Sequence, residues 1–274
     1  MYGATVKNLN ISGRTNTLTQ ADCASADVNS TQFYFYAPLS SQCINSTIEN
    51  CTSIFRFEAD IDYRCCVSPL IGLLDGGTIN GCKITTISNI NAHGYIFFSG
   101  IAATIINSGR VVNSALLQGS SITMNSEGEM AGVTTRLYDG SIENCYVLAN
   151  LTSTSSNPVY AAGIVTICNG GVVDNCYFMG TCSAYKAFAI ARRIVKSESL
   201  IHFCYAPSNG DMPLIGSVSD GRYEACYELK NATTLSDAGY YGTLSLSHEL
   251  TARSKTIPDA RQWIEYGGTV IVVD

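Results

Sequence analysis

A six-residue phrase recurs along most of the chain, and this internal repeat limits the possible folds more than any other feature. The phrase is Gly or another small residue, any residue, Ile or Val, usually a polar residue, Asn and Cys, as in Ser46–Cys51 and Gly140–Cys145. Eight copies align, with their last positions at residues 9, 51, 82, 114, 145, 176, 204 and 226. The four central intervals are 31 or 32 residues long, so each copy marks one structural unit.

A second, apolar phrase precedes the first one in most units, as in Ala131–Val133 and Ala162–Ile164. Turn signals such as Asp139-Gly140 lie between the two phrases. No unit has a helical period, which excludes the helical repeat folds and leaves at least two short strands in each unit. Because a single coil cannot bury its own apolar face, these strands must pair with their copies in neighbouring units.

The repeat therefore predicts an all-β, right-handed parallel β-helix (solenoid) of about seven to eight coils, with a small C-terminal cap that contains one short helix. The right hand follows from the preference of parallel crossover connections. Each coil advances by a strand spacing of about 4.8 Å, so that eight coils make a rod roughly 40 Å long. We place the solenoid at residues 1–231, with an insertion at about residues 21–42 that lengthens the first interval, and the cap at residues 232–274.

The fifth position of the phrase is Asn in five copies and Gly81 in a sixth. The third and sixth positions both carry core-type residues, although strict alternation along a strand would place them on opposite faces. A left-handed corner between them resolves the conflict, since Asn and Gly tolerate that conformation. The sequence predicts stacked corners at this position, and the alternative is a surface row of ordinary conformation. The corner residues include Asn50, Asn113, Asn144 and Asn175.

Cysteine fills the sixth position in most copies, and we interpret these residues as unpaired thiols that stack in the core. Ser114 and Leu9 replace Cys in two copies, so pairing is not required at every coil. Disulfides between adjacent coils are the alternative, and Cys23 with Cys43, which flank the insertion, are a better candidate pair. No spacing suits a zinc site, and we predict neither a metal nor a cofactor. The column consists of Cys51, Cys82, Cys145, Cys176, Cys204 and Cys226.

The C-terminal region has a different pattern. Thr256–Asp259 has an early Pro and an acidic residue at the offset of a capping box, which predicts a helix over Ala260–Tyr266, ended by Gly267-Gly268. We expect Trp263, the only tryptophan, to cover the exposed end of the core, and Thr269–Val273 to form a closing strand.

Composition excludes several classes of partner. With a net charge of −6 and no basic stripe, the chain is not expected to bind nucleic acid. No stretch approaches the roughly 20 apolar residues of a membrane helix, so membrane insertion is not expected either. The chain begins inside a repeat without a signal peptide, which favours a segment of a larger protein over a complete one.

No catalytic constellation is recognisable in the sequence. The carboxylates that align with the repeat are separated by whole coils and are expected to lie on solvated strand faces; they are Glu49, Glu143, Asp174 and Glu224. Asp75, Asp139 and Asp220 each precede Gly and are typical turn residues. The adjacent pair Arg192-Arg193 is the one candidate for binding an anionic sugar.

Tyrosine follows the sixth position in four consecutive copies, as Tyr146, Tyr177, Tyr205 and Tyr227. Neighbouring coils would stack these rings into an aromatic column about 15 Å long. An exposed column could bind sugar rings or a partner protein, whereas an inward column belongs to the core. The structural role is the favoured one of the two.

The phrase with its upstream apolar strand resembles the GLUG-motif repeats of bacterial cell-surface proteins. The best matches are Gly140–Tyr146 and Ala162–Ile164, and the resemblance covers roughly residues 2–230. It implies a non-enzymatic extracellular or cell-surface module, an adhesin-like scaffold or stalk that binds a glycan or a host or neighbouring cell-surface protein along one face. The alternative is a carbohydrate-active β-helix enzyme of the polysaccharide lyase or glycosidase kind.

Overall fold

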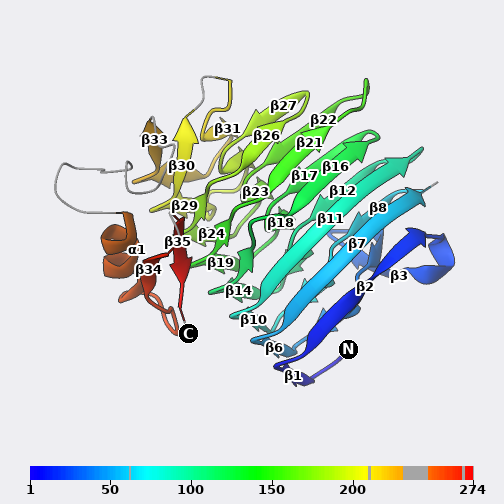
Figure 1. Ribbon diagram of the computed structural model, residues 1–274, viewed down its shortest axis with the longest axis horizontal. Helices are drawn as coiled ribbons and strands as arrows, with labels where there is room; N and C mark the ends of the chain where they lie inside the picture. The colour runs from blue at the N-terminus through cyan, green and yellow to red at the C-terminus, as the bar shows by residue number, and fades with distance from the viewer. Residues whose placement is uncertain (62, 209–210, 231–245, 267–268, 274) are drawn as a thin grey trace.

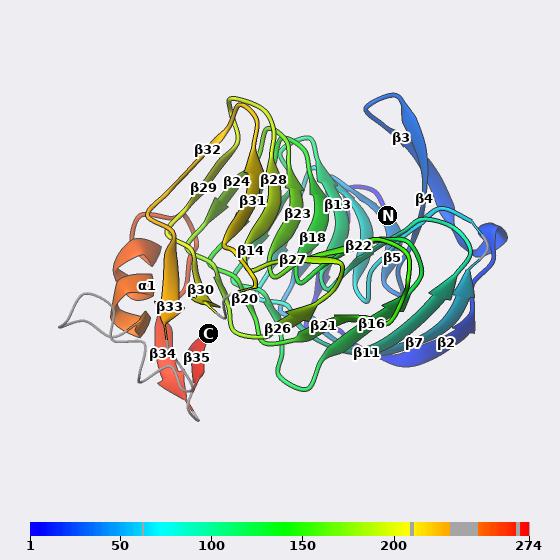
Figure 2. The ribbon, with the colours of Figure 1, turned by 90° about the horizontal axis from the view of Figure 1, so that it is seen from above.

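The computed structural model describes residues 1–61, 63–208, 211–230, 246–266 and 269–273. Apart from one α-helix and one turn of 3-10 helix, the regular structure of these residues is β-strand. Four sheets of mostly parallel strands form a β-solenoid of about five turns, with partial turns at both ends (Figures 1 and 2). None of the helices in these ranges is long and apolar enough to cross a membrane.

Each complete turn passes through four sheets, which we name C, D, A and B in the order in which the chain visits them. Sheet C contains β2 (Asn10–Thr17), β7 (Thr52–Ile61), β11 (Lys83–Ala92), β15 (Ala115–Leu116), β16 (Ser121–Asn125), β20 (Tyr146–Val147), β21 (Asn150–Ser153), β25 (Tyr177–Phe178), β26 (Thr181–Ser183), β30 (Tyr205–Ser208) and β33 (Tyr227–Lys230). Sheet D contains β3 (Ala24–Val28), β4 (Thr31–Tyr36), β8 (Cys65–Val67), β12 (Ile96–Ser99), β17 (Gly128–Ala131), β22 (Val159–Ala162) and β27 (Lys186–Phe188).

The other two sheets complete the turn. Sheet A contains β5 (Ser40–Ile44), β9 (Ile71–Asp75), β13 (Ala102–Ile106), β18 (Thr134–Leu137), β23 (Val165–Cys168), β28 (Ala191–Ile194) and β31 (Ile215–Val218). Sheet B contains β1 (Thr5–Lys7), β6 (Thr47–Glu49), β10 (Thr78–Asn80), β14 (Arg110–Val112), β19 (Ser141–Glu143), β24 (Val172–Asp174), β29 (Leu200–His202) and β32 (Arg222–Glu224). Outside them lie η1 (Gln20–Asp22), α1 (Leu246–Ser254), β34 (Trp263–Tyr266) and β35 (Thr269–Val272).

Strand register confirms that the repeat units lie side by side. In sheet B the apolar third position of each phrase pairs with its copy in the next coil, in the column Val6, Ile48, Ile79, Val111, Ile142, Val173, Ile201 and Tyr223. The six central members are fully buried, while Tyr223, at the end, is 50% exposed. One apolar cluster runs through the inside of the coils, as stacking of coils that cannot fold alone requires.

The left-handed corner expected between the third and sixth positions is present. The backbone angle φ is 53° at Asn50, 66° at Gly81 and 53° at Asn144. It is also positive at Phe203 (48°) and Ala225 (49°), where the phrase has lost its Asn. The geometry of the coil therefore imposes this conformation, and Asn or Gly adopts it at the lowest cost.

The insertion in the first interval is a β-hairpin in which β3 and β4 pair antiparallel. The end of strand β4, Phe35 and Tyr36, also pairs parallel with β8, and β5 pairs with β9, so residues from Phe35 onward belong to a regular coil. The extra residues are therefore fewer than the predicted range of 21–42, and they comprise η1, β3, the turn before β4 and the first residues of β4. Figure 2 shows the hairpin projecting beside sheet A.

The C-terminal region differs from the prediction. The helix is α1, and the predicted helical segment Ala260–Tyr266 contains strand β34, which pairs antiparallel with β35. The proline and acidic residues near position 258 serve a turn, because Asp259 has a φ of 58° and cannot start a helix there. A strand at the predicted place is confirmed as β35, but it pairs with β34 in a separate two-stranded sheet and does not close a coil. The predicted boundary at residues 231 and 232 and the stop at Gly267-Gly268 lie outside the described residues.

Candidate functional site

The C-terminal residues 246–266 and 269–273, which we call the strap, pack on the side of the solenoid along the column of Asn corners. Asn144 lies at the centre of this contact and is fully buried. Its amide nitrogen donates to Asn113 Oδ1 at 2.7 Å and to the Arg261 carbonyl at 3.0 Å. Its Oδ1 accepts from Asn175 Nδ2 and Ser254 Oγ, each at 2.7 Å, and from Trp263 Nε1 at 2.5 Å.

The neighbouring corners hold the strap in the same way. The side-chain nitrogen of Asn113 donates to the Asp259 carbonyl at 2.8 Å, and that of Asn175 donates to the Leu250 carbonyl at 2.9 Å. Arg261 reaches Asn50 Oδ1 at 2.8 Å. The Asn column thus has two roles, because it turns the backbone at each coil and also presents amide groups to the strap.

The tyrosine column points away from the central core and lies beneath the strap. Tyr146 and Tyr177 stack with their ring centroids 5.7 Å apart and 7° between ring planes, and both rings contact Trp263. Tyr146, Tyr177 and Tyr205 are each at most 3% exposed, and Tyr227 is half-buried. Burial raises the pKa of Tyr177. With the strap in this position, the three buried rings offer no surface to a ligand.

Trp263 therefore lies elsewhere than predicted. It covers the side of the solenoid at Tyr146 and Tyr177, and its indole nitrogen reaches Asn144, whereas the sequence placed it over the end of the core. The reason is chemical, since the Tyr and Asn columns offer both an apolar surface and a hydrogen-bond acceptor to an indole.

Replacing Trp263 with Phe tests the contribution of this hydrogen bond. The ring surface is largely kept, but Asn144 Oδ1 and Ser254 Oγ lose the indole donor. We expect a loss of about 1–2 kcal/mol in the free energy of unfolding and faster amide exchange in the strap. Tyr266→Phe, at a site 69% exposed, is the control and should change neither quantity. Unchanged exchange in the Trp263 variant would contradict the placement of the indole.

The contacts of the column cysteines explain why the sixth position usually carries a small side chain that can donate a hydrogen bond. Each of its thiols lies within hydrogen-bond distance of the carbonyl two residues before it, as in Cys145 to Glu143 at 3.1 Å and Cys176 to Asp174 at 3.2 Å. Ser114 makes the equivalent bond to the Val112 carbonyl at 2.9 Å. The side chain thus gives a carbonyl at the corner a second donor, beside the backbone amide of a neighbouring coil. Sequence reasoning did not identify this role, although the Cys-to-Ser exchange pointed to it.

All twelve cysteines lie in the described residues as free thiols. Along the column, the thiol of Cys82 lowers the pKa of Cys51 to about 6, while its own pKa is raised. Cys23 and Cys43 are not partners in the structure, because Cys43 is fully buried in the central core and Cys23 lies 3.6 Å from Cys65 (Sγ to Sγ).

The carboxylates that align with the repeat do not gather into one site in the structure. Glu143 pairs with Arg110 at 2.7 Å, and Glu49 pairs with Lys7 at 2.5 Å. Asp174 is 5% exposed and binds Arg253 of the strap at 2.7 Å, so its role is to anchor the strap. Burial opposes ionisation of Asp174, but the hydrogen bonds from His202 and Arg253 lower its pKa.

A buried charged cluster lies on the outer side of sheets D and A. Of its members the sequence singled out only Arg192, as a candidate for binding an anionic sugar, and the structure places that side chain on a carboxylate. Glu129 of β17 is 2% exposed and forms ion pairs with Arg136 of β18 and with Arg192 of β28, the latter at 2.6 Å. Arg192 also stacks on the Tyr160 ring, 3.6 Å from its centroid. Burial opposes ionisation of Glu129, but the two guanidinium groups outweigh it and lower the pKa. Charged residues inside otherwise apolar strands were the available signal.

The hairpin encloses a polar cleft with the turns that follow sheet A. This cleft, which we call the hairpin pocket, has a volume of about 280 Å³. Val28, Ile106 and Tyr138 from its lining also belong to the small apolar cluster that holds the hairpin against sheets A and D. Among the described residues, Asn169 Oδ1 is buried without a hydrogen-bond partner. The lining consists of Asp27, Val28, Asn29, Ile106, Asn107, Tyr138, Asp139, Asn169 and Lys196.

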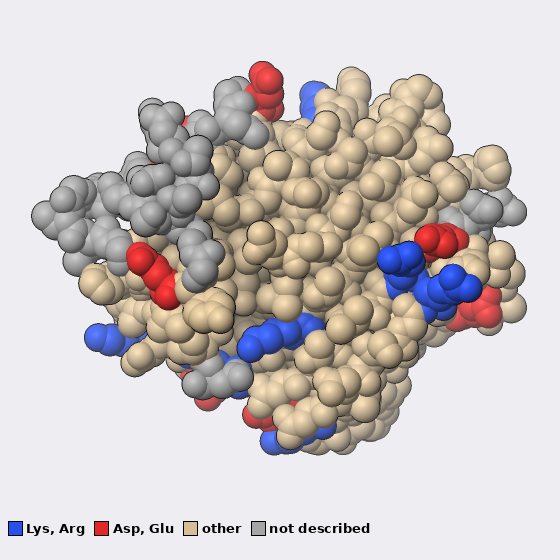
Figure 3. Space-filling view, in the orientation of Figure 1, with Lys and Arg blue, Asp and Glu red and all other residues tan. Residues whose placement is uncertain are grey.

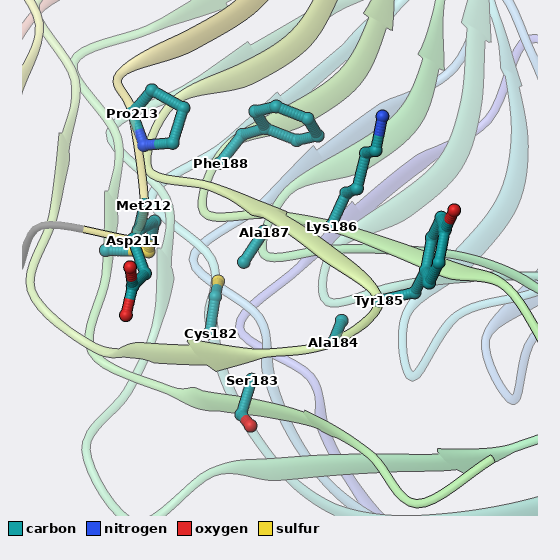
Figure 4. Close-up of a pocket in the computed structure, with 10 residues that line it drawn as sticks. All are labelled: Cys182, Ser183, Ala184, Tyr185, Lys186, Ala187, Phe188, Asp211, Met212 and Pro213. Atoms are coloured by element: carbon teal, nitrogen blue, oxygen red, sulfur yellow. The ribbon is translucent and has the colours of Figure 1, made fainter. Parts of the chain in front are cut away.

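A larger pocket of about 540 Å³ lies where sheets C and D end, at β26 and β27. Figure 4 shows Lys186 and Tyr185 on one side of it and Asp211 on the opposite side. Tyr185 is 65% exposed and meets Tyr160 edge to face at 6.0 Å.

The outer face of sheet C is poor in charged side chains. Figure 3 shows few Lys, Arg, Asp or Glu side chains over this face. Its strands expose aligned hydroxyl and amide side chains, as in the paired residues Ser121, Asn150 and Thr181. Thr181 Oγ1 donates to Asn150 Oδ1 at 2.8 Å along this row. The face thus carries little charge and presents hydroxyl and amide side chains together with the exposed Ile54 and Ile87.

The described residues offer no candidate metal site, and comparisons with known proteins give no relative. In the part of the chain that the structure describes, no group of three or more His, Cys, Asp or Glu side chains could hold a metal ion. Comparison with protein-family models, with curated proteins and with solved structures finds no match to the chain.

Proposed function

We propose that this chain is a non-enzymatic module of an extracellular or cell-surface protein, in which the solenoid is a rigid scaffold and the hairpin pocket binds a carbohydrate. The observation that carries the proposal is the polar cleft between the hairpin and the turns after sheet A. Insertions in repeat proteins commonly fall on the binding face. Here the insertion supplies Asp27, Val28 and Asn29, and the regular coils supply the rest.

The chemistry of the lining suits a ligand rich in hydroxyl groups. The amides of Asn107 and Asn169 and the carboxylates of Asp27 and Asp139 can together accept and donate to adjacent hydroxyls, as sugar recognition requires. Tyr138 offers a partly exposed ring on which a sugar face can pack. The volume of about 280 Å³ fits one or two sugar rings better than a folded protein segment.

The wider proposal rests on the repeat. We infer membership of the GLUG-motif repeat proteins, an adhesin-like role and a larger parent protein from the resemblance of Gly140–Tyr146. The proposed solenoid is right-handed and, when partial coils are counted, has the predicted seven to eight coils. The neutral face of sheet C supports the scaffold role, because a surface without strong charge suits a stalk that holds other domains.

A glycan array with the whole chain tests the binding proposal. Asp27→Asn and Lys196→Gln change exposed side chains of the hairpin pocket, so the fold should be kept. We expect each variant to lose at least tenfold in affinity for the glycan that the unmodified chain selects. Glu198→Gln, two residues from Lys196 and also exposed, is the matched control and should bind normally. Binding that survives both pocket substitutions would overturn the assignment.

A carbohydrate-active enzyme is the second candidate, favoured by the two carboxylates that border one pocket. Glycoside hydrolysis uses a pair of Asp or Glu residues on either side of the scissile bond, and Asp27 and Asp139 could supply them. Release of reducing ends from polysaccharides by the unmodified chain, lost in both Asp27→Asn and Asp139→Asn, would replace the first proposal with this one. The binding proposal expects no release.

A further inference from the structure

We propose that Cys23 and Cys65 form a disulfide under oxidising conditions, which links the insertion covalently to the solenoid. Cys23 follows η1 at the start of the insertion, and Cys65 begins β8 in sheet D. Their sulfur atoms are 3.6 Å apart although 42 residues separate them in the chain. This pair differs from Cys23 with Cys43, which the sequence favoured, and it is independent of the proposed carbohydrate binding.

The surroundings hold the two thiols together. Tyr63 Oη lies 3.0 Å from Cys23 Sγ and donates to the Thr19 carbonyl at 2.7 Å. The same tyrosine packs edge to face on Tyr34 of the hairpin, with the ring centroids 6.0 Å apart. Tyr63 therefore contacts the chain on both sides of Cys23. This arrangement reduces the movement that bond formation needs.

The two thiols differ in access and in acidity, as an attacking and a resolving cysteine should. Cys23 is half-buried, whereas Cys65 is fully buried. The neighbouring Cys65 thiol lowers the pKa of Cys23, while the interaction with Cys23 together with burial raises the pKa of Cys65. Cys23 is thus the thiol that a dissolved oxidant meets first and in its more reactive form.

The oxidant is a low-molecular-weight disulfide such as oxidised glutathione. The Cys23 thiolate attacks one sulfur of the oxidant, which forms a mixed disulfide and releases one thiol. Cys65 then loses its proton and displaces the second thiol from Cys23, which leaves the Cys23–Cys65 bond. Two protein thiols are oxidised by two electrons in total, and one oxidant molecule is reduced to two thiols.

The column cysteines are not expected to compete for the oxidant, because all but Cys226 are at most 1% exposed, Cys51 with its lowered pKa included. Cys226 is half-buried, but the neighbouring Cys204 thiol raises its pKa. Cys145 and Cys176 are fully buried, and each is bonded to its own coil through a backbone carbonyl. Closing the 42-residue loop between Cys23 and Cys65 constrains the unfolded chain, which stabilises the folded state. We expect a rise in Tm of roughly 5 °C or more on oxidation.

The test uses the full chain in oxidised glutathione, followed by alkylation of free thiols and peptide mass spectrometry. The expected result is a peptide pair joined through Cys23 and Cys65, together with the rise in Tm. Cys23→Ser should abolish both, while the matched variant Cys43→Ser should keep both. Cys23 recovered as a lasting mixed disulfide, as a free thiol or joined to Cys43 would overturn the proposal.

Discussion

Replacing Asn144 with Ala is expected to lower the free energy of unfolding by about 4 kcal/mol. Two costs add at this position. Ala lacks the tolerance of Asn for the left-handed corner, where φ is 53°, which costs about 1 kcal/mol. The substitution also removes five side-chain hydrogen bonds and leaves Trp263 Nε1 and Asn175 Nδ2 each with one partner fewer at a buried site. Urea unfolding followed by circular dichroism measures the loss.

Two further variants separate these costs. Asn8→Ala changes a corner with nearly the same φ, 55°, at an exposed position, and should cost only about 1 kcal/mol. Asn144→Gly restores the freedom of the backbone but not the hydrogen bonds, so it should remain near 3 kcal/mol below the unmodified chain. Equal effects of the Ala substitution at both positions would show that Asn144 does not hold the strap.

Replacing Glu129 with Ala is expected to cost about 3–5 kcal/mol at neutral pH. The substitution leaves two guanidinium groups, those of Arg136 and Arg192, without their shared carboxylate at a largely buried site. Glu58→Ala is the control, because Glu58 is half exposed and lies 3.9 Å from Arg56. Exposed pairs of this kind contribute less than about 1 kcal/mol. A similar small loss at Glu129 would contradict the buried ion pairs.

The same carboxylate gives the stability a predictable dependence on pH. The folded-state pKa of Glu129 lies below the ordinary value of 4.5, so the folded state binds fewer protons than the unfolded state. The contribution of Glu129 is therefore complete above the ordinary value and is lost as the pH falls through the lower, folded-state pKa. Glu129→Gln should thus differ most from the unmodified chain near pH 7, and the difference should shrink in acid. A difference that grows in acid would reverse the assigned sign.

Much of the fold could be predicted from the sequence because the coils repeat one local requirement, that two residues three positions apart both face the core. Ile142 and Cys145 need the same interior although they are three residues apart, and only a corner at Asn144 satisfies both. This local requirement recurs every 31 or 32 residues in the centre, so it fixes the register of neighbouring coils as well. The columns follow from that register.

The candidate sites could not be predicted in the same way, because they join residues that no local pattern relates. Asn144 and Trp263 are 119 residues apart, and no sequence pattern indicates that they are in contact. The helix was misplaced because a proline beside Asp259 suits a turn as well as a helix start. Glu129 and Arg136 could not be predicted from the repeat, because the neighbouring coils carry uncharged residues at the same positions. The hairpin pocket combines turn residues such as Asp139 with an insertion whose direction the sequence leaves open.

Parallel stacking of the coils underlies every proposal here, and scalar couplings across hydrogen bonds measure it directly. In a deuterated, isotope-labelled sample, the amide nitrogen of Val172 should couple to the carbonyl carbon of Gly140, and that of Ser141 to the carbonyl carbon of Gly109. The corresponding nitrogen-to-oxygen distances are 2.9 and 3.0 Å. Observation of both couplings, each linking a coil to the next, is the predicted result. Couplings of these amides to carbonyls within their own coil, or in an antiparallel pattern, would contradict the solenoid.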